Sequence, residues 1–181
     1  MNENDIKLEV FQDEDVAIFT QWLDKDYIYK WFCCDGKDDA QARIDGLEGR
    51  KAWIDEVTTR KENPHRNQFI AMTNHGDVKI GFGICLDLTG EPEYTKEQYP
   101  DLYGNIKPGE AFEIGYCIGE EAYLGRGVGK IIIKKLEAAA RDLGAALLLS
   151  DPSEDNIPSV KVLLANGFEK HKDTDYRKKL K

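Results

Sequence analysis

The second half of the chain alternates between strand-like and helix-like segments around a glycine-rich turn, and this order constrains the fold more than any other feature. A strand is predicted over Ala111–Ile118, the turn over Leu124–Gly129 and a helix over Lys130–Leu143. A strand over Ala145–Ser150, a helix over Ile157–Asn166 and a closing pair of strands follow. Strands that alternate with helices in this way are typical of an α/β fold.

The first half contributes further strands and helices. Lys7–Phe11 alternates like a strand, and apolar residues recur at helical spacing within Asp15–Leu23. The polar stretch Asp38–Lys61 is predicted to form one or two helices, and Gln68–Met72 and Val78–Leu88 an antiparallel hairpin. Five apolar residues of the polar stretch are expected to face the core: Ile44, Leu47, Trp53, Ile54 and Val57.

No linker, repeat or low-complexity tract separates the two halves. One domain spanning residues 1–181 is therefore expected, built on one mixed sheet with helices on both faces. Between the halves, Thr89–Gly109 contains three prolines and shows no hydrophobic periodicity. This segment is predicted to be an ordered flap or a mobile loop rather than part of the core.

Composition argues against several classes of function. The chain has 25 basic and 34 acidic residues, a net charge of −9, which disfavours binding to nucleic acid. No apolar run approaches the roughly 18 residues of a membrane span, and the polar start lacks a secretion signal, so a cytoplasmic protein is expected. The four cysteines include no CxxC pair and the three histidines share no ligand spacing, so neither a disulfide framework nor a metal site is predicted.

The turn Leu124–Lys130 has the composition of an anion-binding site. Its glycines permit positive φ and leave amide N–H groups uncovered, while Arg126, Lys130 and the helix start add positive charge, which suits a pyrophosphate. A dinucleotide-binding fingerprint would need glycine at Lys130, and a P-loop would need Ser or Thr at Ile131. The remaining alternative is a helix start that merely contains glycines.

Two segments in the correct order resemble motifs of the GNAT (Gcn5-related) N-acetyltransferases. Tyr123–Gly129 resembles the acetyl-CoA motif, which reads Gln or Arg, two residues, Gly, one residue, then Gly or Ala. Gly127 and Gly129 match its two small positions, whereas Leu124 replaces the Gln or Arg. Further along, Asn156–Phe168 resembles the last helix of the family with its Gly-Phe ending.

This resemblance implies a GNAT-like fold with a central, mostly antiparallel sheet, and it implies acetyl-CoA as the cosubstrate. Ten residues are assigned to the cosubstrate site: Ile118, Leu124, Gly125, Arg126, Gly127, Val128, Gly129, Lys130, Asn156 and Ser159.

The two halves of the chain are similar to different branches of the family. The last helix, with Asn156, Ser159 and Leu163, resembles ribosomal-protein alanine N-acetyltransferases, which implies acetylation of protein amino termini. The first half, with Trp22-Leu23 and Trp31-Phe32, resembles aminoglycoside N-acetyltransferases. We favour acetyl transfer to a primary amine of a small cationic molecule, by a monomer or a homodimer. A coenzyme A-binding protein without catalysis is the third hypothesis.

The expected chemistry requires a base, because an amine of this kind is protonated at neutral pH. Glu113 is the first candidate, since the resemblance places its strand beside the thioester. Asp151, at the carboxyl end of a strand, is the second candidate and is expected to anchor the acceptor. The alternatives are an exposed strand glutamate without a role and an aspartate that caps its own turn.

Other residues complete the expected site. The resemblance assigns the acid for the leaving thiolate to a tyrosine of the last helix, where this chain has Leu163. Tyr116 and Tyr123 are the candidates by their proximity in sequence, and the alternative is that they pack in the core or a lid. Trp31 and Phe32 are expected to wall the acceptor pocket or else to pack in the core.

Gly115 predicts a bulge or a close backbone approach rather than flat pairing. The resemblance implies that a bulge there parts two strands, and a backbone N–H at the bulge would stabilise the thioester oxygen.

Overall fold

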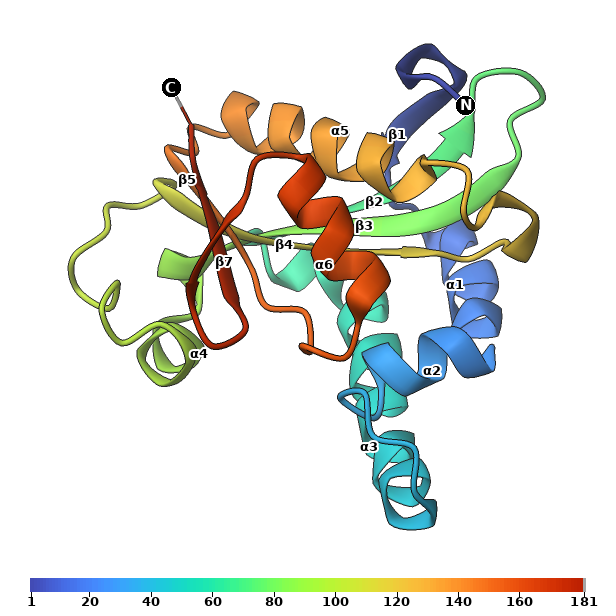
Figure 1. Cartoon of the computed structure of the whole chain (residues 1–181), viewed down its shortest axis with the longest axis horizontal. Helices are drawn as coiled ribbons and strands as arrows, with labels where there is room; N and C mark the ends of the chain where they lie inside the picture. Colours follow the sequence, from blue (N-terminus) through green and yellow to red (C-terminus); the bar gives the residue numbers. More distant parts are fainter. Residues whose placement is uncertain (181) are drawn as a thin grey trace.

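The computed structural model describes residues 1–180, and its centre is a seven-stranded sheet (Figure 1). The strands are β1 (Ile6–Val10), β2 (Arg66–Thr73), β3 (Lys79–Asp87), β4 (Ala111–Ile118), β5 (Leu147–Ser150), β6 (Glu169–Lys172) and β7 (Asp175–Lys179). They lie in the order β1-β2-β3-β4-β5-β7-β6, and only β4 and β5 are parallel neighbours. The expected mixed, mostly antiparallel sheet is confirmed.

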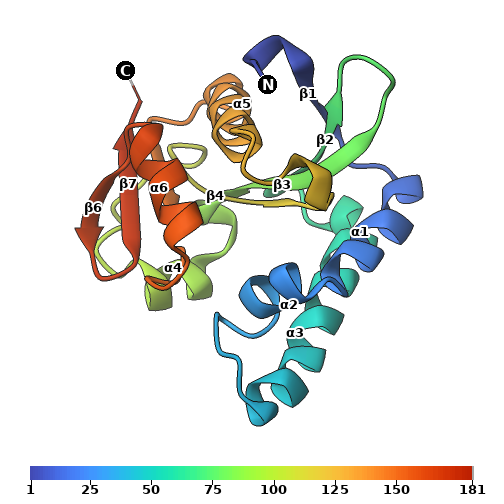
Figure 2. The ribbon, with the colours of Figure 1, turned by 45° about the vertical axis from the view of Figure 1, so that its right-hand side comes forward.

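Helices cover both faces of this sheet, as predicted. They are α1 (Val16–Leu23), α2 (Asp26–Phe32), α3 (Ala40–Thr58), α4 (Pro92–Gln98), α5 (Val128–Asp142) and α6 (Ile157–Ala165). The helix α5 contacts β1, β3, β4 and α6 on one face, whereas α1, α2 and α3 gather on the opposite face (Figure 2). Within residues 1–180, no helix is both long and apolar enough to cross a membrane.

Successive residues of each strand point to opposite faces of the sheet, so each strand contributes side chains to both faces. In β2, Ala71 belongs to the core under α5, while its neighbours Ile70 and Met72 belong to the core under α1, α2 and α3. The four-residue spacing of Ile132 and Leu136 places both on the buried side of α5. Each face of the sheet therefore has its own hydrophobic core.

An aromatic cluster fills the core under α1 and α3. The ring of Phe82, on β3, lies 5.7 Å from Phe11, 4.4 Å from Phe19 and 6.2 Å from Trp53. The side chain of Phe82 is completely buried. Because edge-to-face and tilted ring pairs are favourable, this cluster attaches the first helices to the sheet.

The expected inward face of Asp38–Lys61 is partly wrong. Val57 is fully buried, but Ile44 and Leu47 are each 60% exposed. Only the second half of α3 lies over the sheet, and its first half extends beyond the sheet, where it packs against α2 (Figures 1 and 2). On that half Ala42 is buried in the core under α1, α2 and α3, whereas Ile44 and Leu47 lie on the exposed side of the helix.

The prediction that Thr89–Gly109 lies outside the core is also wrong. A short 3-10 turn at Leu88–Gly90 leads into α4, and Tyr99 is 2% exposed. Tyr99 and Leu102 pack with residues of β3, β4 and β5 in a third cluster. The segment showed no periodicity because α4 has only seven residues, and Pro92 occupies its first turn.

We expect Phe82→Ala to lower the free energy of unfolding by about 3–5 kcal/mol, because it leaves a cavity among three aromatic rings. Chemical denaturation followed by tryptophan fluorescence measures this change. The matched substitution Ile44→Ala, at an exposed position of α3, should change stability by less than ~0.5 kcal/mol. A large loss of stability in Ile44→Ala would instead indicate that Ile44 faces the core, as the sequence predicted.

Candidate functional site

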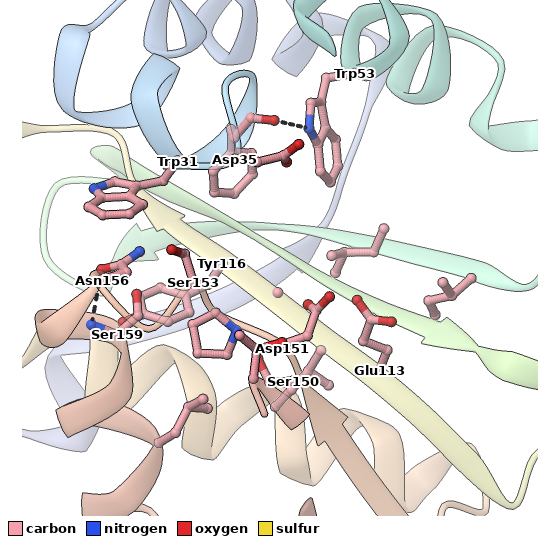
Figure 3. A pocket seen from close by; sticks show the side chains of 18 of the residues that line it. Trp31, Asp35, Trp53, Glu113, Tyr116, Ser150, Asp151, Ser153, Asn156 and Ser159 are labelled. Carbon is pink, nitrogen blue, oxygen red and sulfur yellow. Dashed lines mark hydrogen bonds between the residues drawn. The ribbon is translucent and has the colours of Figure 1, made fainter. Parts of the chain in front are cut away.

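A cavity of about 640 Å³ opens where β4 and β5 part (Figure 3). The last pair between these strands joins Glu113 to Leu149. Beyond it, β4 continues to Ile118 while the chain after Ser150 turns towards α6. The separated strands leave an edge of β4 without a strand partner, and the cavity lies along that edge.

Seven residues predicted separately from the sequence line this one cavity. They are Trp31, Phe32, Glu113, Tyr116, Asp151, Asn156 and Ser159. Trp31 and Phe32 come from α2, Glu113 and Tyr116 from β4, and the others from the loop after β5 and from α6. The cavity therefore joins the candidate acceptor wall to the candidate base and acid.

The predicted bulge at Gly115 is wrong. Pairing between β3 and β4 continues in register through Ile84–Gly115 and on to Ile118. The opening arises on the other side of β4, where pairing with β5 stops after Glu113. Because β4 and β5 separate where their pairing ends, the opening between them does not require the extra residue that a bulge would insert in β4.

Glu113 and Asp151 form a pair of carboxyl groups within the cavity (Figure 3). Burial first, and then the charge of Asp151, raise the pKa of Glu113 to about 8, although two tyrosine hydroxyls oppose the shift. Burial is also the largest cause that raises the pKa of Asp151, to about 6, and the Asp175 and Asp35 carboxylates add to it. The pair therefore keeps a proton to a higher pH than ordinary carboxyl groups do.

The two hydroxyls that hold Glu113 come from the segment around α4. The Tyr94 hydroxyl donates to Glu113 Oε2 at 2.7 Å, and the Tyr99 hydroxyl lies 3.1 Å from the same oxygen. Neither tyrosine was singled out from the sequence. Their segment showed no periodicity, so no local signal indicated that it returns to the cavity.

Tyr116 connects the cavity to the start of α5. Burial raises the pKa of Tyr116 to about 12, although an interaction with the Ser159 side chain opposes the shift. A Cβ atom at Gly129 would lie 2.8 Å from the Tyr116 hydroxyl. Ser159 N–H in turn donates to Asn156 Oδ1 at 3.3 Å, so Asn156 caps α6.

The glycine-rich turn lies outside this cavity, at the amino-terminal end of α5. Gly125 and Gly127 have φ of 69° and 77°, and a Cβ atom at either would meet nothing within 4 Å. Among residues 1–180, no protein oxygen accepts from the main-chain N–H groups of residues 125–130. An open row of N–H groups at a helix start attracts anions. Leu124, Arg126 and Lys130 are exposed around it.

Ile118 does not reach the cavity. Its side chain packs against the core under α5, and its carbonyl accepts from the Tyr27 hydroxyl at 3.1 Å. The structure therefore separates the predicted cosubstrate residues into two groups. Asn156 and Ser159 line the cavity, whereas Ile118 and the turn lie beyond it.

Acidic groups dominate the charge of the cavity. Arg66, its one lining arginine, contacts Glu91 at 2.9 Å and also pairs with Glu56. Within residues 1–180, Asp35 and Asp151 form no ion pair with a basic side chain. The cavity is therefore suited to a positively charged ligand.

Known proteins share both sequence features and the fold of this chain. Residues 5–169 match a family model described as an acetyltransferase (GNAT) domain, while a comparison with curated protein sequences finds no match. The fold is similar to that of the aminoglycoside acetyltransferase AAC(6')-Ib in complex with ribostamycin and coenzyme A, with a TM-score of 0.72 and 17% identity over 97% of this chain and 93% of that chain. It is also similar to that of the aminoglycoside N(6')acetyltransferase from Legionella pneumophila, with a TM-score of 0.67 and 19% identity over 99% and 94%.

The raised pKa of Glu113 predicts a dependence of stability on pH. The folded-state pKa of Glu113, about 8, exceeds the ordinary value of 4.5, so the folded state favours the protonated carboxyl. The contribution of Glu113 to the free energy of unfolding is therefore fully present below about pH 4.5 and is lost as the pH rises to about 8. The free energy of unfolding of Glu113→Gln should therefore improve relative to the unsubstituted chain between about pH 4 and about pH 8. Urea denaturation across this range tests it, and a constant difference would contradict the assignment.

Proposed function

Because the chain belongs to the GNAT acetyltransferase family, we propose that it transfers the acetyl group of acetyl-CoA to a primary amine of a small cationic molecule. The observation that carries this proposal is the pair of carboxyl groups, Glu113 and Asp151, in a cavity beside the parted strands β4 and β5. A carboxylate of raised pKa beside unpaired acidic groups suits the binding and deprotonation of an ammonium ion.

The turn before α5 is the proposed site of the cosubstrate's pyrophosphate. Its free N–H groups and the adjacent Arg126 and Lys130 supply positive charge without requiring the missing Gln or Arg at Leu124. Solved structures of AAC(6')-Ib, a protein of similar fold, are complexes with coenzyme A or acetyl-CoA. An extended ligand of this kind would pass from the turn, along Tyr116, to the cavity.

Glu113 is the proposed base. An ammonium group at neutral pH must lose a proton before its nitrogen attacks the thioester, and a base of raised pKa accepts that proton more readily than an ordinary glutamate. The proton then resides on the Glu113 carboxyl. Asp151 and Asp35 would hold the positive charge of the acceptor, while Trp31 and Phe32 wall the cavity.

Tyr116 is the proposed acid for the leaving thiolate. Its pKa of about 12 keeps the hydroxyl protonated at neutral pH, so it can donate a proton to the departing sulfur. The second proton that the nitrogen loses as the amide forms would return to the Tyr116 oxygen. It lies between the start of α5 and α6, on the route proposed for the cosubstrate. Leu163, at the position of the family's tyrosine, is buried and lines the same cavity without offering a proton.

An acetyl transfer assay tests this function. The protein, acetyl-CoA and a panel of aminoglycosides, polyamines and amino sugars are combined, and thiol release is followed. Glu113→Gln should lower kcat/KM by roughly 10²–10⁴, because the base is lost. The control Glu169→Gln, exposed on β6, should keep full activity.

The same assay separates the alternatives. Turnover restricted to peptides that begin with alanine or serine would replace the small amine with protein amino termini. Coenzyme A binding without turnover of any amine or peptide would identify a protein that binds the nucleotide but does not catalyse transfer.

Coenzyme A binding tests the turn independently of the acceptor. At about 100 times its Kd, coenzyme A should raise the free energy of unfolding by about 2.7 kcal/mol. Gly127→Val should remove this increase, because a side chain would cover the N–H groups. Gly104→Val is a matched control, since Gly104 also has positive φ, 73° against 77°, and open space around it. Both variants suffer backbone strain, but a retained increase in Gly127→Val would exclude the turn as the binding site.

A further inference from the structure

One oxygen of Glu113 is held by two donors, and the other is left open. The hydroxyls of Tyr94 and Tyr99 both bond to Oε2. No protein donor of residues 1–180 bonds to Oε1, yet Oε1 is not among the buried polar atoms that lack a partner. Oε1 is therefore accessible from the cavity that Glu113 lines. The carboxyl group is fixed at one end and presents the other end to a ligand.

The segment that carries both tyrosines is itself fixed to the core. Leu88 is fully buried and Tyr99 is 2% exposed. The hydroxyl of Thr95, inside α4, donates to the Leu88 carbonyl at 2.6 Å, and the Tyr94 and Tyr99 rings lie 6.3 Å apart in an edge-to-face contact. Two hydroxyls on such a support hold a carboxyl group in one orientation, which a single bond from a mobile loop would not do.

We propose that Tyr94 and Tyr99 are positioning residues, which turn Glu113 Oε1 towards the acceptor amine and stabilise the charged carboxylate. This inference rests on the proposed function, in which Glu113 is the base. Other groups also act on Glu113 from the elements around it: Asp151, after β5, opposes its charge, and Arg66, on β2, favours it. The tyrosine hydroxyls act in the same direction as Arg66, whose charge is already shared between Glu56 and Glu91.

Removal of either tyrosine hydroxyl is expected to make the Glu113 carboxyl harder to ionise. A hydroxyl that donates to a carboxylate stabilises its ionised form, so loss of either hydroxyl makes Glu113 a group that ionises at higher pH. At neutral pH a smaller fraction of the protein would then carry the ionised base. Loss of a hydroxyl would also free the carboxyl group to rotate, so that Oε1 no longer has a fixed direction.

The test measures the ionisation of Glu113 directly. The protein is labelled with ¹³C at glutamate carboxyl carbons, the Glu113 resonance is assigned with Glu113→Gln, and its titration is followed in Tyr94→Phe and Tyr99→Phe. Each variant should shift the midpoint upwards by roughly one pH unit, the effect of losing one hydrogen bond to a charged group. Tyr103→Phe is the matched control, because Tyr103 follows α4, is 43% exposed and makes no bond to Glu113. Its midpoint should remain unchanged.

A midpoint that stays constant or falls in both tyrosine variants overturns the inference, and this result requires no acceptor. Kinetics supply the second readout, because Tyr99→Phe should lower kcat and move the acidic limb of its pH profile upwards while KM for the amine changes little. If the midpoint shifts but no amine is acetylated, the hydroxyls stabilise the carboxylate and the proposed function fails. If amines are acetylated and the midpoint does not shift, the function stands and the positioning role fails.

Discussion

The site depends on β4 keeping one neighbouring strand while it loses the other. Pairing with β3 continues to Ile118, so β4 remains part of the sheet along its whole length. Pairing with β5 stops at Glu113, so the polar groups on that edge face a cavity instead of a strand. An unpaired strand edge is costly when buried, and it is useful where a ligand can supply the missing partners. The seven-stranded sheet therefore gives rigidity to a site that would otherwise consist of loops.

Charge in the cavity is set by local pairing rather than by the net charge of the chain. A net charge of −9 by itself is compatible with simple solubility. Glu56 and Glu91 both bind Arg66, and among residues 1–180 neither Asp35 nor Asp151 forms an ion pair with a basic side chain. Two exposed aspartates beside a carboxyl of raised pKa favour a positively charged ligand over a neutral or negative one.

Within residues 1–180, the seven strands, four of the six helices, the turn before α5 and seven residues of the cavity could be predicted, because each is marked by a local pattern of period, glycine or motif. The short helices α2 and α4 could not. Tyr94 and Tyr99 could not. They depend on a fold in which a seven-residue helix between β3 and β4 returns to the cavity. The exposure of Ile44 and Leu47 was hidden for a similar reason, since a helical period does not reveal how far a helix extends beyond the core. Gly115 predicted a bulge that the structure does not contain, because β4 separates from β5 simply where their pairing ends, after Glu113.

The two small residues of the glycine motif have different physical reasons to be small, and this difference connects the turn to the cavity. Gly127 adopts a left-handed conformation with open space around it, so its constraint comes from the backbone and from the exposed N–H groups. Gly129 lies inside α5, where its constraint is the ring of Tyr116. A side chain there would displace that ring, which lines the cavity, and so alter the wall of the cavity. A motif usually interpreted as a phosphate cradle therefore also fixes the position of Tyr116, between the turn that would bind the nucleotide and the cavity that would bind the amine.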